Sequence, residues 1–321
     1  MKAKKICILG GTGFVGRHLS LALVQRGYQV RVLSRHPQRH RDLATRDVEV
    51  LTADIYDEQA LQNRLSGVDA VINLVGILNE RGSSNGSGFR RAHVDLARTV
   101  VNACKAAGVG RLLHMSALKA GDPTALSYYL RTKGEGEDVV HAAAGPGFAV
   151  TSFRPSVIFG RGDQFLNRFA FLLRLAPMLP LACSEARLAP VYVGDVVAAM
   201  VASLENPASH GQRYNLCGPK VYTLYQIVDY LSGLLHRKRV ILRLSPALSQ
   251  LQAKILERIP GKPFSMDNYL SLQTDSTCVN GHSLPFGIVP TSLEVIAPYA
   301  VGDSAQRARY CQMRSHAGRE C

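Results

Sequence analysis

The chain has 321 residues, of which 46% are hydrophobic and 19% charged, which predicts a globular protein of one large or two modest domains and argues against disorder. Its 38 basic and 24 acidic residues give a net charge of +14, but the charges are scattered and no tryptophan or basic–aromatic repeat accompanies them. We therefore expect no nucleic-acid binding, and the apolar runs are too short or too interrupted to predict a transmembrane segment.

The seven cysteines are dispersed and include no CxxC pair, which argues against a metal site. They are Cys7, Cys104, Cys183, Cys217, Cys278, Cys311 and Cys321. An odd, scattered set favours reduced thiols in a cytoplasmic compartment. Cys7 and Cys217 lie in apolar, strand-like runs, so we expect both in the core.

The first 155 residues alternate short apolar runs with helical patterns. Strict alternation of β and α units predicts a parallel sheet covered by helices on both faces, a doubly wound Rossmann fold of the α/β class. The expected strands are 4–10, 28–35, 48–54, 69–76, 111–117 and 148–155, and the expected helices are 13–27, 57–67, 92–108 and 127–143.

After Pro155 the pattern loosens, with helices expected at about 164–176, 195–205 and 223–236 and short strands near 188–193 and 212–218. We predict a cofactor domain over 1–155, a smaller and partly interleaved C-terminal substrate or interaction lobe over 156–300, and a basic tail over 301–321. Between 245 and 259, five apolar residues share one helical face. They are Leu248, Leu251, Ile255, Leu256 and Ile259, and we expect core packing there, with a membrane anchor as the alternative.

A glycine-rich turn, GGTGFVG, joins the first expected strand to the first expected helix. Gly10 allows the tight turn, Gly13 lets a pyrophosphate approach the backbone, and Gly16 lets helix and strand pack closely. Amides at the helix N-terminus then face the phosphates. This context predicts a dinucleotide site.

The end of the second strand bears on which dinucleotide binds. An acidic residue there would hold the ribose 2′-hydroxyl of NAD(H), but the sequence reads VLSRHPQRHR and has none before Asp42. Ser34 and Arg35 suit a 2′-phosphate, and Arg39 adds charge. We therefore expect NADP(H), with NAD(H) as the alternative. Asp54, after the third strand, is predicted to accept the adenine amino group or to cap a turn.

The segment SYYLRTKGE places Tyr129 and Lys133 four residues apart on one helical face. A lysine there can lower a tyrosine pKa and hold a ribose hydroxyl, while the tyrosine passes a proton to a carbonyl during hydride transfer. Tyr128 has no lysine at that spacing, so we assign it no catalytic role.

The order of these motifs resembles that of the extended and atypical short-chain dehydrogenases/reductases, the NAD-dependent epimerase/dehydratase superfamily. The phosphate turn, TADIYD, NLVG (Asn73 to Gly76), the YLRTK helix and RPSVIFGRGD follow the family's order over about residues 5 to 235. Within it, the chain is similar to the branch related to the NADPH-binding accessory subunit of mitochondrial complex I, through AHVDLARTVVNACKAAGVGRLLHMSAL, YLRTKGEGE and DNYLSLQTDS.

The resemblance implies a place for each matching residue around the cofactor. It puts Gly10, Thr12, Gly13, Phe14, Val15 and Gly16 at the pyrophosphate, Asp54 and Ile55 at adenine, Leu74, Val75 and Gly76 near the ribose, Lys133 on the nicotinamide ribose, and Pro155 beside the nicotinamide ring.

Two departures from the family pattern bear on turnover. The reductases carry Ser-Ser or Ser-Thr after the fifth strand, whereas here Ser116 is followed by Ala117 and Leu118. Ser116 is therefore predicted either to polarise a substrate carbonyl or to be a strand-end hydroxyl bonded to backbone. His93 stands where the family has a structural Asn. Elsewhere, Asp195 is predicted to cap a helix and His114 to lie in the core.

These features leave two main functions open. One is an NADP-dependent oxidoreductase or epimerase in which Tyr129, Lys133 and Ser116 act on a small or quinone- or isoprenoid-related substrate. The other is a cofactor-holding accessory, assembly or regulatory protein, cytoplasmic or peripheral to the inner face of a respiratory membrane, with a respiratory-complex or quinone-biosynthetic partner. A sensor of the NADPH/NADP⁺ ratio is a third.

Overall fold

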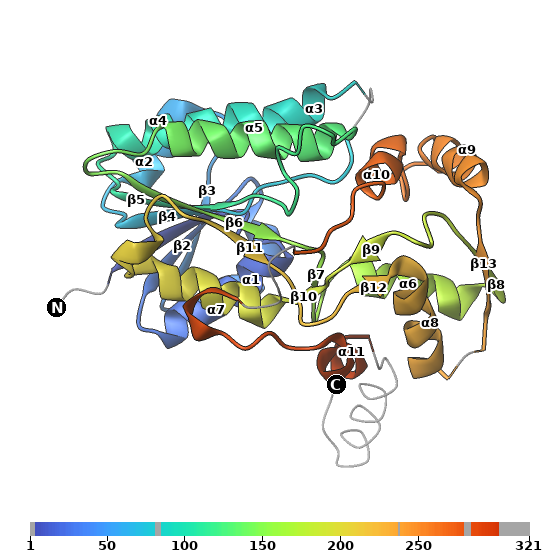
Figure 1. Ribbon diagram of the computed structural model, residues 1–321. Coiled ribbons are helices and arrows are strands. Elements are labelled where there is room, and N and C mark those ends of the chain that lie inside the picture. Colours follow the sequence, from blue (N-terminus) through green and yellow to red (C-terminus); the bar gives the residue numbers. More distant parts are fainter. Residues whose placement is uncertain (1–3, 81–84, 237, 279–283, 302–321) are drawn as a thin grey trace, which may run out of the picture.

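A seven-stranded, wholly parallel sheet lies at the centre of the computed structural model, which describes residues 4–80, 85–236, 238–278 and 284–301 (Figure 1). The strand order is β11-β6-β5-β4-β1-β2-β3. The strands are β1 (Lys5–Leu9), β2 (Gln29–Ser34), β3 (Val48–Thr52), β4 (Ala70–Asn73), β5 (Arg111–Met115), β6 (Ala149–Pro155) and β11 (Arg213–Leu216). The order reverses between β1 and β4, and such a reversal opens a crevice at the carboxyl ends of the strands.

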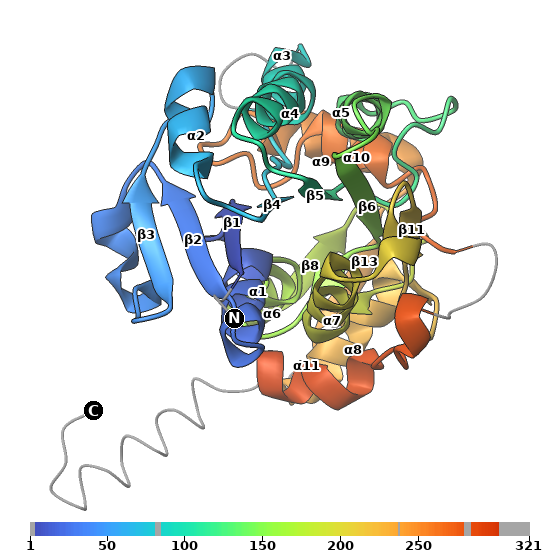
Figure 2. The same ribbon diagram turned by 90° about the vertical axis from the view of Figure 1, so that its left-hand side faces the viewer.

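Helices cover both faces of this sheet (Figure 2). One face carries α2 (Glu58–Leu65), α4 (Leu96–Ala106) and α5 (Tyr128–Ala142), and the other carries α1 (Phe14–Gln25) and α7 (Val193–Leu204). Strand β1 is buried from Ile6 to Leu9 because both of its faces pack against apolar side chains. The predicted Rossmann fold and its six strands are confirmed.

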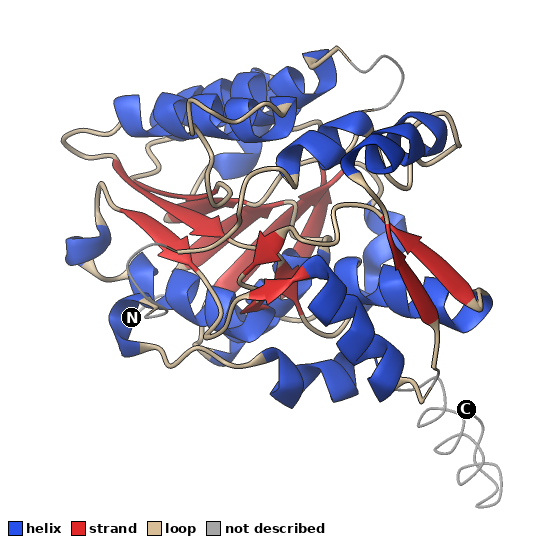
Figure 3. Ribbon diagram, turned by 45° about the vertical axis from the view of Figure 1, so that its right-hand side comes forward, coloured by secondary structure: helices blue, strands red, loops and turns tan. Residues whose placement is uncertain are grey.

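The second half of the chain returns to this sheet. Strand β11 pairs with β6 along the sheet edge, and α7 packs against α1. Short strand pairs and helices make up the rest (Figure 3). The pairs are β7 (Ile158–Phe159) with β10 (Val191–Tyr192), β9 (Arg187–Leu188) with β12 (Tyr222–Thr223), and β8 (Met178–Leu181) with β13 (Val240–Arg243). The helices are α6 (Phe165–Leu175), α8 (Leu224–Leu234), α9 (Pro246–Leu256), α10 (Met266–Ser271) and α11 (Leu293–Val301), while the short α3 (Ser87–Arg90) precedes α4.

Helices α6 and α8 pack on each other over a third apolar core that includes Phe159, Leu173 and Leu231. None of the described helices combines the length and apolar character that a transmembrane span requires. The predicted tail, 301–321, lies outside the described residues apart from Val301.

The prediction of reduced thiols is wrong for one pair of cysteines. Cys217 is buried as expected, but it forms a disulfide with Cys278, 61 residues later. Cys217 follows β11, and the segment before Cys278 runs beside β9, where Leu188 pairs with Ser276. The spacing of Cys217 and Cys278 along the sequence does not predict this disulfide, because the tertiary fold brings the two cysteines together. Cys7 and Cys104 are buried free thiols.

Asp195 does not cap its own helix as predicted. It lies in the first turn of α7, whose N-cap position is Tyr192. Its carboxylate accepts hydrogen bonds from the backbone N–H (2.7 Å) and the hydroxyl (3.0 Å) of Thr291, two residues before α11. Asp195 thus ties a distant loop to α7. His114 is buried, as expected.

The predicted core packing of the apolar face on α9 is also wrong. The helix forms, but its buried residues are Ser249 and Ala253, whereas Leu248, Leu251 and Ile255 face outward. The helix lies at the margin of the C-terminal lobe, and among the described residues it is the side carrying Ser249 and Ala253 that is buried against the rest of the lobe. Periodicity identified the helix and its apolar face, but it did not show which face the rest of the chain covers.

Candidate cofactor and active site

The glycine-rich turn lies at the end of β1, where the strand order reverses. Gly10 has φ +78°, a conformation that favours glycine. A Cβ on Gly16 would overlap Gly10 and Gly11, so only glycine lets α1 approach the turn this closely. Sequence and geometry agree on why glycines stand at these positions.

The N-terminus of α1 is open to an anion. Gly13 is the N-cap residue, no side chain caps the helix, and its first turn has no acidic residue. The amides of Phe14, Val15 and Gly16 belong to this first turn, where a helix leaves N–H groups without intrahelical partners. The nearby Arg17 donates to the carbonyl oxygen of Thr12 and pairs with Asp42. These features fit a dinucleotide pyrophosphate.

The end of β2 is polar and cationic. Ser34 Oγ accepts a hydrogen bond from the His36 amide at 3.1 Å, and Arg35 and Arg39 are exposed. In the next loop, Asp54 Oδ1 accepts from the Tyr56 amide at 3.0 Å, so it caps a turn. The second carboxylate oxygen of Asp54 and the partly buried Ile55 lie in the same loop after β3, where the resemblance places the adenine.

The segment after β4 joins the glycine turn to the candidate active site. An ideal Cβ on Gly10 would lie 3.2 Å from the carbonyl carbon of Leu74 and 3.3 Å from the Val75 nitrogen. A Cβ on Gly76 would lie 3.5 Å from Lys133 Nζ and 3.6 Å from His93 Nε2. The predicted phosphate and catalytic residues therefore meet along one edge of the sheet. Pro155 ends β6 on that edge, and its carbonyl oxygen accepts from Leu118 N at 2.9 Å.

Helix α5 holds Tyr129 and Lys133, and two groups fix where it begins. Ser127 caps it by accepting from the Leu130 amide. Asp267 on α10 accepts from the amides of Tyr128 (2.6 Å) and Tyr129 (3.2 Å). Both are acceptors for N–H groups that a helix start leaves without partners. The C-terminal lobe thereby fixes the first turn of α5.

Lys133 is a buried cation at the centre of the site. Its side chain is 4% exposed, and Nζ donates to the carbonyl oxygen of Met115 at 2.6 Å. Burial lowers the pKa of Lys133 to about 8, and the Glu137 carboxylate opposes that shift. An ammonium has three donors, so Lys133 retains capacity for a ribose hydroxyl.

Tyr129 packs its ring against His93 and Phe89, with ring centroids 5.6 and 6.3 Å away. Burial raises the pKa of Tyr129 to about 12, and the Asp267 carboxylate adds to the rise. The predicted lowering by Lys133 is therefore wrong for the protein alone, because desolvation of the phenolate dominates. At neutral pH Tyr129 holds its proton.

His93 takes the bridging position that the resemblance assigns to an Asn. Its Nε2 accepts from the Ile77 amide at 3.2 Å, so Nδ1 carries the ring proton and donates to Thr132 Oγ1 at 2.9 Å. Burial, with Lys133 nearby, lowers the pKa of His93 to about 2. A neutral histidine thus links the loop after β4 to α5.

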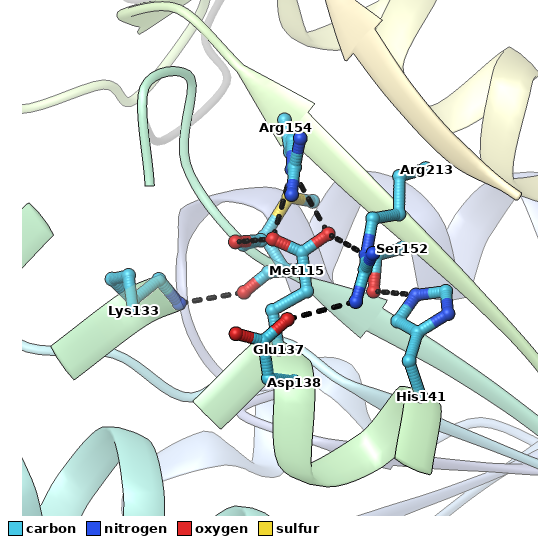
Figure 4. Close-up of polar contacts among 9 residues, drawn as sticks. Met115, Lys133, Glu137, Asp138, His141, Ser152, Arg154 and Arg213 are labelled. Atoms are coloured by element: carbon cyan, nitrogen blue, oxygen red, sulfur yellow. Dashed lines mark hydrogen bonds and ion pairs between the residues drawn. The ribbon is translucent and has the colours of Figure 1, made fainter. Parts of the chain in front are cut away.

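Ser116 takes part in a buried ionic network around Glu137. Figure 4 shows the contacts of Glu137 with Arg154 and Arg213. The Ser116 hydroxyl donates to Glu137 at 2.8 Å, and Glu137 also binds Arg154 at 2.8 Å and Arg213 at 3.4 Å. Glu137 is fully buried and lies one helical turn after Lys133. The hydroxyl of Ser116 therefore donates its hydrogen bond to a side chain within the protein. The predicted alternative, a hydrogen bond from this hydroxyl to the backbone, is not what the structure shows.

Tyr128, to which the sequence assigned no catalytic role, lines a cavity of about 140 Å³ between the start of α5 and α10. Its walls include Phe89, Met266 and Leu270, with Glu80 and Lys262 supplying polar groups. Tyr129 follows Tyr128 in the chain but is not among the residues that line this cavity.

Several site residues escaped the sequence analysis. Glu137 lies four residues after Lys133, a spacing that could have marked it as a neighbour on the same helical face. Arg154, Arg213 and Asp267 come from β6, β11 and α10, and nothing local in the sequence joins them to α5.

Comparisons with known proteins agree with this architecture. A family model described as the NAD dependent epimerase/dehydratase family matches residues 6–217. Ceramide reductase of Caulobacter vibrioides is 37% identical over 203 residues, which cover 63% of this chain and 61% of that enzyme's length. NADH dehydrogenase (ubiquinone) 1 alpha subcomplex subunit 9, mitochondrial, of Mus musculus is 29% identical over 303 residues, covering 90% of this chain and 77% of the subunit.

The fold also matches solved structures. The structure described as MoeE5 in complex with UDP-glucose and NAD has a TM-score of 0.67 and 22% sequence identity, and it covers 75% of this chain and 85% of its own. Identity at this level shows a shared fold. The family match spans the whole parallel sheet, the glycine turn and α5. The chain belongs to the NAD dependent epimerase/dehydratase family and has an NAD(P)-binding Rossmann fold.

Proposed function

We propose that this protein is an NADP(H)-dependent reductase of the short-chain dehydrogenase/reductase type, with Tyr129 as proton donor and Lys133 as ribose-binding cation. The observation that carries this proposal is the position of Lys133. Its buried ammonium lies beside Gly76 and one helical turn from Tyr129, on the edge reached by the glycine turn.

The bound nicotinamide would supply or accept the hydride. In the proposed reaction, the α1 amides bind the pyrophosphate, Lys133 donates to the nicotinamide ribose, and Leu74 to Gly76 border that ribose. Pro155 lies against the ring, while Asp54 and Ile55 border the adenine. Tyr129 donates its phenolic proton to the carbonyl oxygen. Because burial raises the pKa of Tyr129 to about 12, the tyrosine is protonated at neutral pH, which favours reduction over oxidation.

The preference for NADP(H) rests on the end of β2. In this proposal Ser34, Arg35 and Arg39 hold the 2′-phosphate. The two arginines are exposed, and the strand ends without an acidic residue. We expect Arg35→Ala to weaken NADPH binding about tenfold or more and to leave NADH binding unchanged, since a charge-assisted bond is lost with one ligand only. If the wild type binds NADPH and NADH with equal affinity, the proposed preference for NADP(H) is wrong.

The cavity beside Tyr128 supports an amphiphilic carbonyl substrate within the small or quinone- or isoprenoid-related range. Its apolar walls suit a chain or ring, and its charged rim suits a polar head. The similarity to a ceramide reductase points the same way. We assign this substrate role to the lobe over 156–300 and the cofactor role to residues 1–155.

The direct test is NADPH consumption with a panel of amphiphilic ketones and quinones. We expect Tyr129→Phe to lower kcat at least about 100-fold, the range of general acid catalysis, while NADPH binding stays within about twofold. Tyr299→Phe, at an exposed tyrosine on α11, is the matched control and should retain kcat. A wild-type protein that binds NADPH but reduces no compound of the panel would refute the reductase.

The engaged hydroxyl of Ser116 favours a second candidate, a cofactor-holding accessory protein. Because its hydroxyl donates a hydrogen bond to Glu137, Ser116 lacks a free donor for a substrate carbonyl. The similarity to a subunit of mitochondrial NADH dehydrogenase supports a respiratory-complex partner. The proposal extends to a quinone-biosynthetic partner and to a location in the cytoplasm at the inner face of a respiratory membrane. Co-purification with such a complex, unchanged in Tyr129→Phe and paired with no turnover, would establish it. Recovery of no such partner from native membranes would exclude it.

A further inference from the structure

Helix α9 presents an apolar stripe to solvent. The four residues Leu248, Leu251, Ile255 and Ile259 are 51%, 52%, 52% and 45% exposed. At about 100° per residue, Leu248, Leu251 and Ile255 fall within one narrow sector, and Ile259 follows in the next turn. Ser249 and Ala253, which are buried, lie on the other side of the helix. We call these four exposed residues the α9 stripe.

A second apolar surface adjoins the stripe. In the parallel β8–β13 pair, Met178 lies opposite Val240 and Pro180 opposite Leu242, and all four are exposed. The alternate residues Leu179, Leu181 and Ile241 face the α6–α8 core. Gln252 of α9 donates to the carbonyl oxygen of Pro180 at 3.0 Å, which joins the two surfaces. Figure 1 shows α9 and the β8–β13 pair together at the margin of the C-terminal lobe.

The border of this surface is cationic. Described residues between 238 and 262 include six basic side chains, Lys238, Arg239, Arg243, Lys254, Arg258 and Lys262, and one acidic side chain, Glu257. Arg243 pairs with Glu185 at 3.2 Å and Arg239 donates to the Leu173 carbonyl oxygen, so the charge beside the stripe comes chiefly from Lys254 and Arg258. Lys254 and Arg258 are exposed and lie three and seven residues after Leu251, so they flank the α9 stripe. An apolar stripe beside basic residues is the pattern of a helix that lies in a membrane interface.

We propose that the α9 stripe and the outward face of β8–β13 dock this protein on an anionic lipid bilayer. The apolar side chains enter the boundary of the acyl chains, while Lys254 and Arg258 contact anionic headgroups. A second copy of the chain would bring two basic borders together, which repel. The C-terminal segment 302–321 has four arginines against one aspartate and one glutamate, so its charge does not complement the border either.

Docking in this way would bring the candidate substrate cavity near the bilayer. The segment that follows α9 supplies Glu257, Lys262 and Met266 to that cavity, and Asp267 from the same segment holds the first turn of α5. If the proposed reductase function holds, on which this consequence rests, its amphiphilic substrate reaches Tyr129 from the lipid phase. Vesicle binding itself does not depend on turnover.

The test is flotation of the full-length protein with vesicles of phosphatidylcholine alone and with added phosphatidylglycerol. We expect binding to the anionic vesicles, an affinity at least about tenfold lower in Leu251→Glu/Ile255→Glu, and a loss of about fivefold per charge in Lys254→Gln/Arg258→Gln at low salt. Leu21→Glu, an exposed leucine on α1, is the matched control and should bind like the wild type. Failure of the wild type to bind, or full binding by the double glutamate variant, would overturn the proposal.

A second measurement tests the proposal even if the Leu251→Glu/Ile255→Glu variant fails to fold. The chain has no tryptophan, so Leu251→Trp introduces a single reporter at an exposed position. Its emission should shift to the blue when anionic vesicles are added, as the indole leaves water. An unchanged spectrum in a sample whose vesicles carry the protein would show that another surface docks. A concentration-dependent shift without vesicles, with a dimer on a sizing column, would show a second copy on the stripe and also overturn the proposal.

Discussion

Lys133 is 4% exposed, and its burial in the protein alone lowers its pKa to about 8. Tyr129, one helical turn earlier, packs its ring against Phe89 and His93, and desolvation raises its pKa to about 12. Desolvation, which penalises the charged form of each group, causes both shifts. At neutral pH the pair therefore consists of an ammonium and a protonated phenol, as the proposed reductase requires of its ribose-binding cation and its proton donor.

The buried Lys133 should make stability depend on pH in a defined window. Its folded pKa of about 8 lies below the ordinary 10.5, so between these values the unfolded chain binds the proton more readily. Stability therefore rises with pH across this window, and the full cost of burying the charge is present below pH 8. Relative to Lys133→Met, the wild type should gain about 3 kcal/mol between pH 8 and 10.5. Denaturant unfolding of both proteins at several pH values measures it, and a constant difference would contradict the burial of a charge.

The sequence predicted the individual site residues better than their partners. Tyr129 and Lys133 follow from a four-residue spacing, and Gly10, Gly13 and Gly16 from a turn whose geometry demands glycine. Ser116 was identified as a hydroxyl at a strand end, but its partner Glu137 lies on another element. Contacts between elements depend on the tertiary packing, so a local pattern does not show them.

At the scale of elements, α5 and the start of α4 pack unusually closely. A π-helical turn at Arg91–Asp95 precedes α4, and His93 lies in it. Helix α5 meets this turn at Gly136, where a Cβ would overlap the carbonyl oxygen of His93. The extra residue of a π-turn is a common way to place a functional side chain. Here it places His93 between Ile77 and Thr132.

Gly136→Ala should therefore destabilise the protein by about 2–3 kcal/mol, because the added methyl group must displace backbone. Gly233→Ala in α8 is the matched control, since nothing lies within 4 Å of its added Cβ. Alanine there should stabilise by about 0.5–1 kcal/mol through its helix propensity. Thermal unfolding of the two variants checks this contrast. A Gly136→Ala variant as stable as the wild type would show that α5 and the π-turn are looser than described.

Elements of the first half were predictable because the central strands β1, β4 and β5 are buried on both faces and each helix ends at a glycine or a turn. The second half was harder to predict, since strands such as β7, β9 and β10 have two residues each. Elements this short carry no periodicity. Helix α9 shows a second limit of sequence-based prediction. Its apolar face was identified correctly, but the sequence did not show that this face is exposed, and it was assigned to the core.

At the scale of the whole molecule, the chain crosses between its two halves more than once. Strand β11 and α7 return to the sheet after Pro155, and the Cys217–Cys278 disulfide joins the end of β11 to the segment after α10. The same segment ties Ser276 to Ser156 at 2.8 Å. The lobe that supplies Asp267 to α5 is thus linked covalently to the sheet.

Removal of this disulfide should lower the stability of the whole protein. A link that closes a loop of this length restricts the unfolded chain by about 4 kcal/mol in the chain-entropy model. We expect Cys217→Ser/Cys278→Ser to unfold at lower denaturant concentration, and a thiol reductant to have the same effect on the wild type but none on the variant. A reductant that leaves wild-type stability unchanged would show that the two thiols are not joined.

Both candidate functions require NADPH to bind at the open N-terminus of α1. Calorimetric titration of the wild type and of Gly13→Asp tests this binding most directly. Aspartate is a favoured N-cap residue and Gly13 has an ordinary φ of −77°, so α1 should keep its stability. Its carboxylate would face the pyrophosphate, and like charges at a binding site cost several kcal/mol, so NADPH affinity should fall by about 100-fold or more. A wild type that binds no NADPH, or a Gly13→Asp variant that binds it as well as the wild type, would contradict the assignment of this turn as the cofactor site.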